Sequence, residues 1–283
     1  MSSFFGLIGR LCRKVIQPIS PNGVMLNVWE TMILVIMVYE LIAIPIEMAF
    51  DFEFSEFFFA MDWIETCWFF VDILLNFHMA YYLDGTYMTR HRDIASYYLR
   101  SWFLADLIAF LPVRLAYRYN LIDGLLNLYS LLGLLRILKL LKIIKVFRIG
   151  QAFSRLKDFV NISGEMNGVM RLVRLWVTIA FLIHWAACFW HLIGTHSLAH
   201  STETWILANG MEHAGYSTRY IKSLYWATAT LLTVGYGDIV AVNSGEEAYS
   251  IFVMLLGSAV VGFSMNQIGS ILQQINSETN YKE

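Results

Sequence analysis

Charged side chains are scarce in this sequence. Only 15% of the 283 residues are charged, whereas 58% are hydrophobic and the mean hydropathy is +0.55, a balance unlike that of soluble domains. The net charge of -2 gives no indication of nucleic-acid binding. Several apolar windows exceed the ~20 residues that a helix needs to cross a bilayer. The composition therefore predicts an integral membrane protein.

Cysteine is also rare, and Cys12, Cys67 and Cys188 have neither disulfide nor metal-ligand spacing. The N-terminus lacks the apolar core and cleavage site of a removable signal peptide. The sequence has no phosphate-cradling glycine loop and no nucleophile–base arrangement, so we expect neither an enzyme nor a bound cofactor. His196 and His200 have a spacing that leaves a metal or proton site open, with ordinary interfacial histidines as the default.

Apolar runs predict an all-α fold of six membrane-crossing helices and one shorter, re-entrant helix. The crossings are expected at about 24–46, 57–82, 95–117, 124–149, 169–193 and 245–275, and the shorter helix at about 218–231. Basic residues near the N-terminus and after the second and fourth crossings belong on the cytoplasmic side. An even number of crossings then places both termini in the cytoplasm.

The chain divides near residue 155 into parts of different character. We expect a cytoplasmic N-terminal segment at 1–23 and a four-helix unit at 24–155, which carries many charges within its apolar runs. A helix, half-helix and helix unit at 156–275 can build a pore, and 276–283 form a cytoplasmic C-terminal stub.

The predicted helix at 124–149 carries a basic residue at every third position, separated by apolar pairs: Arg136, Lys139, Lys142, Lys145 and Arg148. Cations in hydrocarbon are costly and therefore usually functional. An amphipathic helix lying on the inner membrane surface is the alternative. The strict period, together with acidic residues in other crossings, favours gating charges of a voltage sensor.

Those acidic residues lie in the second and third predicted crossings. Glu65, Phe69 and Asp72 have the spacing of one helix face, and Asp62 lies one turn earlier. Asp106 interrupts the next apolar run. Because a buried carboxylate needs a partner, we expect these residues to pair with the basic stripe as charge-transfer partners, with Phe69 as an apolar plug. Static ion pairs are the alternative.

Residues 233–238 read Thr-Val-Gly-Tyr-Gly-Asp. Glycine enters left-handed conformations at little steric cost, which lets successive carbonyl groups turn toward one axis and replace the hydration shell of K⁺. We predict a selectivity filter formed by Thr233, Val234, Gly235, Tyr236, Gly237 and Asp238. The permeant K⁺ would be bound by the carbonyls of Thr233, Val234, Gly235 and Tyr236. One copy supplies a quarter of such a filter, which implies four chains.

Further candidates flank the filter. The aromatic side chains of Tyr225 and Trp226 precede it by about two turns and are expected to support it from behind. Gly257 and Gly262 interrupt the last apolar run and are candidate hinges of an inner gate. Close helix packing is the alternative reading of Gly257.

These segments resemble the transmembrane part of voltage-gated cation channels. Within that superfamily the chain is most similar to the branch related to cyclic-nucleotide-binding-domain channels, which includes ether-à-go-go-type, plant inward-rectifier-type and pacemaker-type channels. The resemblance covers about 29–274 and, besides the filter, is carried by FVDILLNF at 70–77, YLRSWFLADL at 98–107, HWAACFW at 184–190, SLYW at 223–226 and MLLGS at 254–258.

The resemblance implies a homotetramer, or a heterotetramer with related subunits, embedded in the lipids of the plasma membrane of a cell or cilium. The expected function is a voltage-gated, K⁺-selective channel subunit that conducts passively. A weakly selective pacemaker-type cation channel and a modulatory subunit of a heteromeric channel are the alternatives. Pacemaker-type channels usually depart from the full potassium motif, whereas Thr233 and Asp238 are both present here.

Overall fold

The computed structural model describes residues 24–50, 56–80, 82–83, 86–88, 90–110, 164–198 and 203–280. The chain forms two units, which meet in sequence between Phe159 and Val160. The N-terminal unit takes 1–40 and 53–159, whereas 41–52 join 160–283 in the C-terminal unit. The first predicted helix therefore contributes to both units, which hydropathy alone does not indicate.

In its described residues, the N-terminal unit contains four helical elements and a small hairpin. Its elements are α2 (Val24–Phe50, up to residue 40), α3 (Glu56–Asn76), β1 (Tyr82–Leu83), β2 (Thr86–Tyr87), α4 (His91–Ser101) and α5 (Phe103–Phe110). Hydropathy predicts a helix as far as residue 82, whereas α3 ends at Asn76. The antiparallel strands β1 and β2 follow, so the fold is not purely helical in the described residues. Asp84-Gly85 between them is a dipeptide typical of tight hairpin turns.

A single helix is predicted at 95–117. In the residues that the structure describes, this region forms two helices, α4 and α5, which meet at Trp102. Tyr98, on α4, is fully buried and packs edge-on against Phe77 and Phe103, with ring centroids 4.9 and 5.8 Å away. The core of this unit therefore holds the end of α3 against the junction of α4 and α5.

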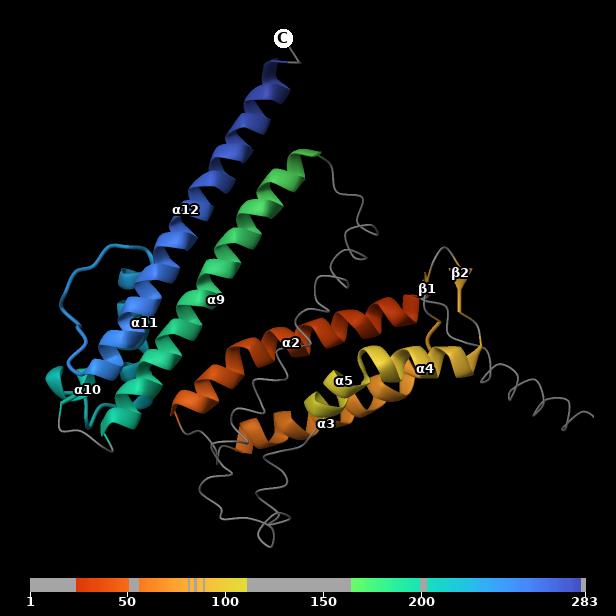
Figure 1. Cartoon of the computed structure of the whole chain (residues 1–283), viewed down its shortest axis with the longest axis horizontal. Coiled ribbons are helices and arrows are strands. Elements are labelled where there is room, and N and C mark those ends of the chain that lie inside the picture. The colour runs from red at the N-terminus through yellow and green to blue at the C-terminus, as the bar shows by residue number, and fades with distance from the viewer. Residues whose placement is uncertain are drawn as a thin grey trace, which may run out of the picture. The chain divides into compact units, whose positions relative to one another are not determined.

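The C-terminal unit is built on two long helices. Figure 1 shows α9 (Gly164–Leu198) and α12 (Ser244–Asn280) running antiparallel, with α10 (Trp205–Ala208) and α11 (Tyr216–Leu231) toward one end of the pair. All three helices predicted for this region are present, and α9 and α12 are longer at both ends. The short helix α10 has no counterpart in the prediction.

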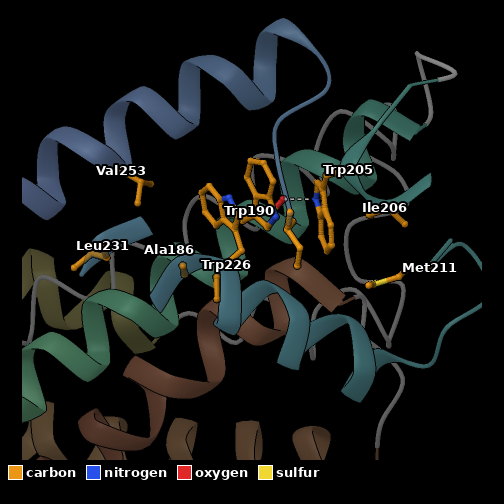
Figure 2. Close-up of a cluster of buried hydrophobic side chains, with 11 residues drawn as sticks. Ala186, Trp190, Trp205, Ile206, Met211, Trp226, Leu231 and Val253 are labelled. Carbon is orange, nitrogen blue, oxygen red and sulfur yellow. Dashed lines mark hydrogen bonds between the residues drawn. The ribbon is translucent and has the colours of Figure 1, made fainter. Parts of the chain in front are cut away.

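Three tryptophans form the core of this unit (Figure 2). Trp190 of α9 stacks on Trp226 of α11 with ring centroids 3.8 Å apart. Trp205, at the start of α10, donates from its indole Nε1 to the Trp190 carbonyl oxygen at 3.3 Å. A Cβ at Gly194 would lie 2.2 Å from that Nε1 atom, so only glycine leaves room for the third ring. Truncating a buried tryptophan typically lowers the free energy of unfolding by about 3–5 kcal/mol. The cluster therefore contributes strongly to holding α9, α10 and α11 together.

Three of the described helices are long and apolar enough to cross a membrane: Val28–Phe50, Met170–Leu198 and Ser244–Ile271. Helix α3 has 21 residues but includes four acidic ones, Glu56, Asp62, Glu65 and Asp72. The predicted crossing at 124–149 lies outside the described residues, and so does the predicted segment 1–23.

Candidate functional site

Helix α11 ends in a hydrogen-bond pattern that fixes the first residues of the predicted filter. The Thr233 N–H donates to the Thr230 carbonyl at 3.1 Å, and the Val234 N–H donates to the Ala229 carbonyl at 2.8 Å. These are the two bonds of a Schellman motif, whose residue after the C-cap is left-handed. That residue is Thr233, with φ of 59°. A non-glycine residue in this region costs about 1–2 kcal/mol, so the helix end holds a strained backbone.

Left-handed backbone recurs at every second residue of the predicted filter, with φ of 59° at Thr233, 64° at Gly235 and 75° at Gly237. Val234 and Tyr236 between them keep negative φ. A backbone that alternates between left-handed residues and residues with negative φ aligns successive peptide groups on one side of the chain. Within residues 203–280, no carbonyl oxygen from 233 to 237 accepts a hydrogen bond from another residue. The loop therefore offers a row of unoccupied acceptor oxygens.

The side chains of this loop point away from the core of the chain. Val234 and Tyr236 are 52% and 68% exposed. Tyr236 stacks on Tyr225 of α11, with ring centroids 6.0 Å apart and planes 4° from parallel. Tyr225 thus contacts the loop directly, whereas Trp226 packs in the tryptophan core. A supporting role for either residue stays a prediction.

Glu246 is a residue of this site that the sequence analysis missed. It lies in the first turn of α12 and is fully buried. Both carboxylate oxygens accept from the Trp205 N–H, at 3.1 and 3.2 Å, and Oε2 also accepts from the Val242 N–H at 3.0 Å. One carboxylate therefore ties the first residue of α10 and the loop after the predicted filter to the start of α12.

A sequence signal for Glu246 exists. Asn243 and Glu246 have the spacing of a capping box, and the Asn243 side chain accepts from the Glu246 N–H at 3.0 Å. A capping Glu ordinarily turns back to its own helix start, whereas here the carboxylate reaches a neighbouring loop as well. A negative charge in this turn also interacts favourably with the helix dipole.

The glycines of α12 have different surroundings. A Cβ on Gly257 would lie 2.7 Å from the Leu231 carbonyl oxygen and 3.0 Å from its Cα atom. At Gly262 no atom lies within 4 Å of that position. Gly257 thus permits close approach of α12 to the end of α11, as its packing interpretation requires. A hinge at either glycine stays a prediction.

Three of the four acidic candidates in the N-terminal unit are buried. Glu65, Phe69 and Asp72 are 6%, 0% and 5% exposed, which agrees with one shared face of α3. Asp62 is half-buried. Asp106 of α5 is fully buried and accepts from the Tyr98 hydroxyl at 2.6 Å.

Trp29 of α2 was not among the predicted site residues. Its indole N–H donates to Asp72 Oδ1 at 3.3 Å, and its ring stacks on Trp68 at 4.5 Å. The basic stripe of five residues, Arg136, Lys139, Lys142, Lys145 and Arg148, lies outside the described residues. The structure therefore places the acidic residues but does not test their pairing with the stripe.

Comparisons with known proteins identify relatives of nearly the whole chain. Residues 26–280 match the ion transport protein family. "Potassium channel AKT1" of Arabidopsis thaliana is 31% identical over 272 residues, which cover 94% of this chain and 30% of that protein. "Potassium channel KAT3" of the same plant is 31% identical over 86% of this chain and 37% of its own length.

A nematode protein is similar to the same region. "Potassium voltage-gated channel unc-103" of Caenorhabditis elegans is 27% identical over 89% of this chain and 32% of its own length. The chain thus spans about a third of the length of these curated relatives.

Glu246→Gln should lower the free energy of unfolding by about 1.5–3 kcal/mol, because an amide NH₂ replaces one acceptor oxygen facing two backbone donors. The measurement is denaturant or thermal unfolding of the solubilised full-length protein. Glu247→Gln is the matched control, since Glu247 is exposed in the same helical turn and should stay within about ±0.5 kcal/mol of the parent. Equal stability of the two variants would contradict the role of Glu246.

Gly257→Ala should destabilise the protein by about 1–3 kcal/mol, because the added methyl group meets the backbone of Leu231. Gly262→Ala is the control, and alanine there should be neutral or stabilising by up to about 1 kcal/mol. Unfolding of the two variants under the same conditions compares them directly. If Gly257→Ala is tolerated as well as Gly262→Ala, close approach of the two helices is not required.

Proposed function

The chain belongs to the ion transport protein family, and from this premise we propose that it is a subunit of a voltage-gated potassium channel in which four chains form one passive pore. The observation that carries the proposal is the loop at 233–238. Its left-handed residues alternate with others, and its carbonyls from 233 to 237 accept no hydrogen bond within the described C-terminal unit. Relatives named as potassium channels support the choice of ion.

The proposed chemistry is the exchange of water oxygens for carbonyl oxygens around a dehydrated K⁺. Strained Thr233 and the two glycines hold these oxygens before an ion arrives. The C-terminal end of α11 leads directly into the loop, and its partial negative charge favours a cation there. K⁺ is here the transported ion rather than a resident cofactor. The presence of both Thr233 and Asp238 favours K⁺ selectivity over a weakly selective pore.

The membrane itself supports an assembly of several chains. Irregular backbone at membrane depth is tolerated only where protein buries it or where it lines a water-filled cavity. The filter residues 233–238 are all exposed in the single chain. We infer that copies of the chain, or related subunits, surround this loop, so that its carbonyls face an aqueous axis and its side chains meet the neighbours.

The arrangement of α2 and α9 supports six crossings. His184 and His191 of α9 meet the carbonyls of Ile42 and Ala49 of α2, at 3.1 and 2.8 Å. Both pairs advance by seven residues, so the two helices run parallel. An odd number of crossings then lies between them, in agreement with α3, α4 with α5, and the predicted helix at 124–149. Helix α11, with 16 residues, is too short to cross and is proposed to be re-entrant.

Voltage sensitivity is proposed from the basic stripe and the buried acidic residues. Moving one charge through 100 mV changes the energy by ~2.3 kcal/mol. About three charges in each of four chains would therefore supply roughly 28 kcal/mol, far more than the few kcal/mol that separate two conformations. The buried face of α3 and the carboxylate of Asp106 are the proposed stations for those charges. With both termini in the cytoplasm, the filter faces the outside of a plasma membrane.

Gly235→Ala should abolish K⁺ current while tetramer assembly is retained. Among the described residues, apart from the two neighbours in the chain, no atom lies within 4 Å of the added Cβ, so the effect comes from φ of 64°, which alanine disfavours. The measurement is K⁺ current of the full-length protein in lipid bilayers, with size-exclusion chromatography for assembly. Gly269→Ala, where no atom lies within 4 Å of the added Cβ and φ is not left-handed, is the control. Parent-like K⁺ current in Gly235→Ala would refute the proposed filter.

Lys142→Gln should make the voltage dependence of opening shallower by roughly a quarter to a third, because one of about three moving charges is lost. Conductance–voltage curves of the full-length channel measure this slope. Lys222→Gln removes the same charge from an exposed position of α11 and should leave the slope unchanged. Unaltered gating in Lys142→Gln would exclude this lysine from the sensor, and parent chains without any current would favour a modulatory subunit.

A further inference from the structure

Helix α2 contains Pro45 near its C-terminal end. Proline has no backbone N–H and therefore cannot donate to the carbonyl four residues earlier. That carbonyl belongs to Leu41, and it accepts instead from the indole Nε1 of Trp185 on α9, at 2.9 Å. A side chain of a neighbouring helix thus takes the place of the missing helical donor.

His184 binds the next carbonyl of α2. Its Nε2 lies 3.1 Å from the Ile42 oxygen, and its Nδ1 lies 2.8 Å from the Tyr220 hydroxyl of α11. A carbonyl can only accept, which assigns the proton of the neutral ring to Nε2 and leaves Nδ1 to accept from Tyr220. One imidazole therefore connects α2, α9 and α11.

A third donor is supplied by His191. Its Nδ1 lies 2.8 Å from the carbonyl oxygen of Ala49, in the last turn of α2, where helix carbonyls have no intrahelical donor. Phe50 stacks on the His191 ring with centroids 3.9 Å apart, and its edge contacts Tyr216 and Tyr220 of α11. His191 is 1% exposed, so this contact belongs to the interior of the C-terminal unit.

Two further observations concern the same segment of α2. Two of the three carbonyls, those of Leu41 and Ala49, are ones that α2 cannot satisfy itself, because of Pro45 in one case and the helix end in the other. Residues 41–52 also fall into the C-terminal unit, although the preceding part of α2 does not. The change of unit at Leu41 coincides with the first carbonyl that α9 binds.

We propose that Trp185, His184 and His191 anchor the last ten residues of α2 as a fixed part of the pore unit, and that Pro45 creates the principal acceptor for this anchor. The inference rests on the proposed function in assigning the C-terminal unit to a pore. Through the bond of His184 to Tyr220, the anchored segment positions α11, whose end carries the filter. The anchored segment is residues 41–50 of α2, which belong to the C-terminal unit together with α9 and α11.

A double-mutant cycle on the full-length protein tests this anchor. Trp185→Phe removes the indole donor and leaves the half-buried Leu41 carbonyl without one, which should lower the melting temperature by about 2–6 °C. Pro45→Ala restores a helical N–H for the same carbonyl. In the Pro45→Ala background, Trp185→Phe should therefore lower the melting temperature by less than half as much. Trp176→Phe, at a 63% exposed position of α9, is the control and should behave alike in both backgrounds.

The cycle distinguishes the anchor from ordinary packing. An alanine at position 45 does not refill the volume of a lost indole, so equal effects of Trp185→Phe in both backgrounds would overturn the proposal. If Trp185→Phe does not assemble, His184 provides the second test. His184→Gln keeps a donor for Ile42 and an acceptor for Tyr220, whereas His184→Leu keeps neither.

Amide hydrogen exchange of α2 from 46 to 50 and of α11 should rise severalfold in His184→Leu and stay near the parent value in His184→Gln. Equal exchange in the two variants would also contradict the anchor. Both readouts are independent of conduction. If the effects of Trp185→Phe and Pro45→Ala on the melting temperature simply add in a protein that conducts K⁺, only the anchor is contradicted. If the two effects are coupled but the protein conducts no ion, only the proposed channel function is contradicted.

Discussion

A peptide carbonyl without a hydrogen-bond donor is not tolerated against hydrocarbon, and the C-terminal unit treats this constraint in two opposite ways. At Pro45 the helix loses a donor, and Trp185 of a neighbouring helix supplies one at 2.9 Å. At 233–237 the carbonyls stay without donors from the described part of the chain, and the loop bends so that they are aligned. The first solution joins two helices. The second is the arrangement on which the proposed K⁺ site rests.

Such a loop needs rigid surroundings, because residues in the left-handed region keep that conformation only where neighbouring contacts hold them. The Schellman motif at the end of α11 fixes Thr233, and Tyr225 stacks on Tyr236. Behind them, Trp190, Trp205 and Trp226 fasten α9, α10 and α11 into one core. Glu246 fixes the loop that leaves the filter, and the missing side chain of Gly257 lets α12 approach Leu231. Strain at the site is thus carried by contacts on every side of it.

Sequence patterns predicted the parts that depend on local chemistry. The glycines of the filter and the apolar runs of α9, α11 and α12 follow from conformational freedom and hydropathy, and the channel family read from the motifs is confirmed by the match over 26–280. The helix predicted from hydropathy continued past Asn76, where α3 ends, because the mean hydropathy of a segment does not distinguish a helix from a short hairpin. Glu246, Trp29 and the division of α2 at Leu41 depend on contacts between segments more than 40 residues apart, which no local pattern contains.

The central claim is that carbonyls of several chains meet at one axis and bind dehydrated K⁺. The most direct measurement is a cryo-electron microscopy map of the full-length protein in lipid nanodiscs with K⁺ as the main cation. We expect four subunits, the carbonyls of Thr233, Val234, Gly235 and Tyr236 directed at the symmetry axis, and a column of ion density between them. A single chain in the disc, or a fourfold assembly in which this loop lies away from the axis, would contradict it.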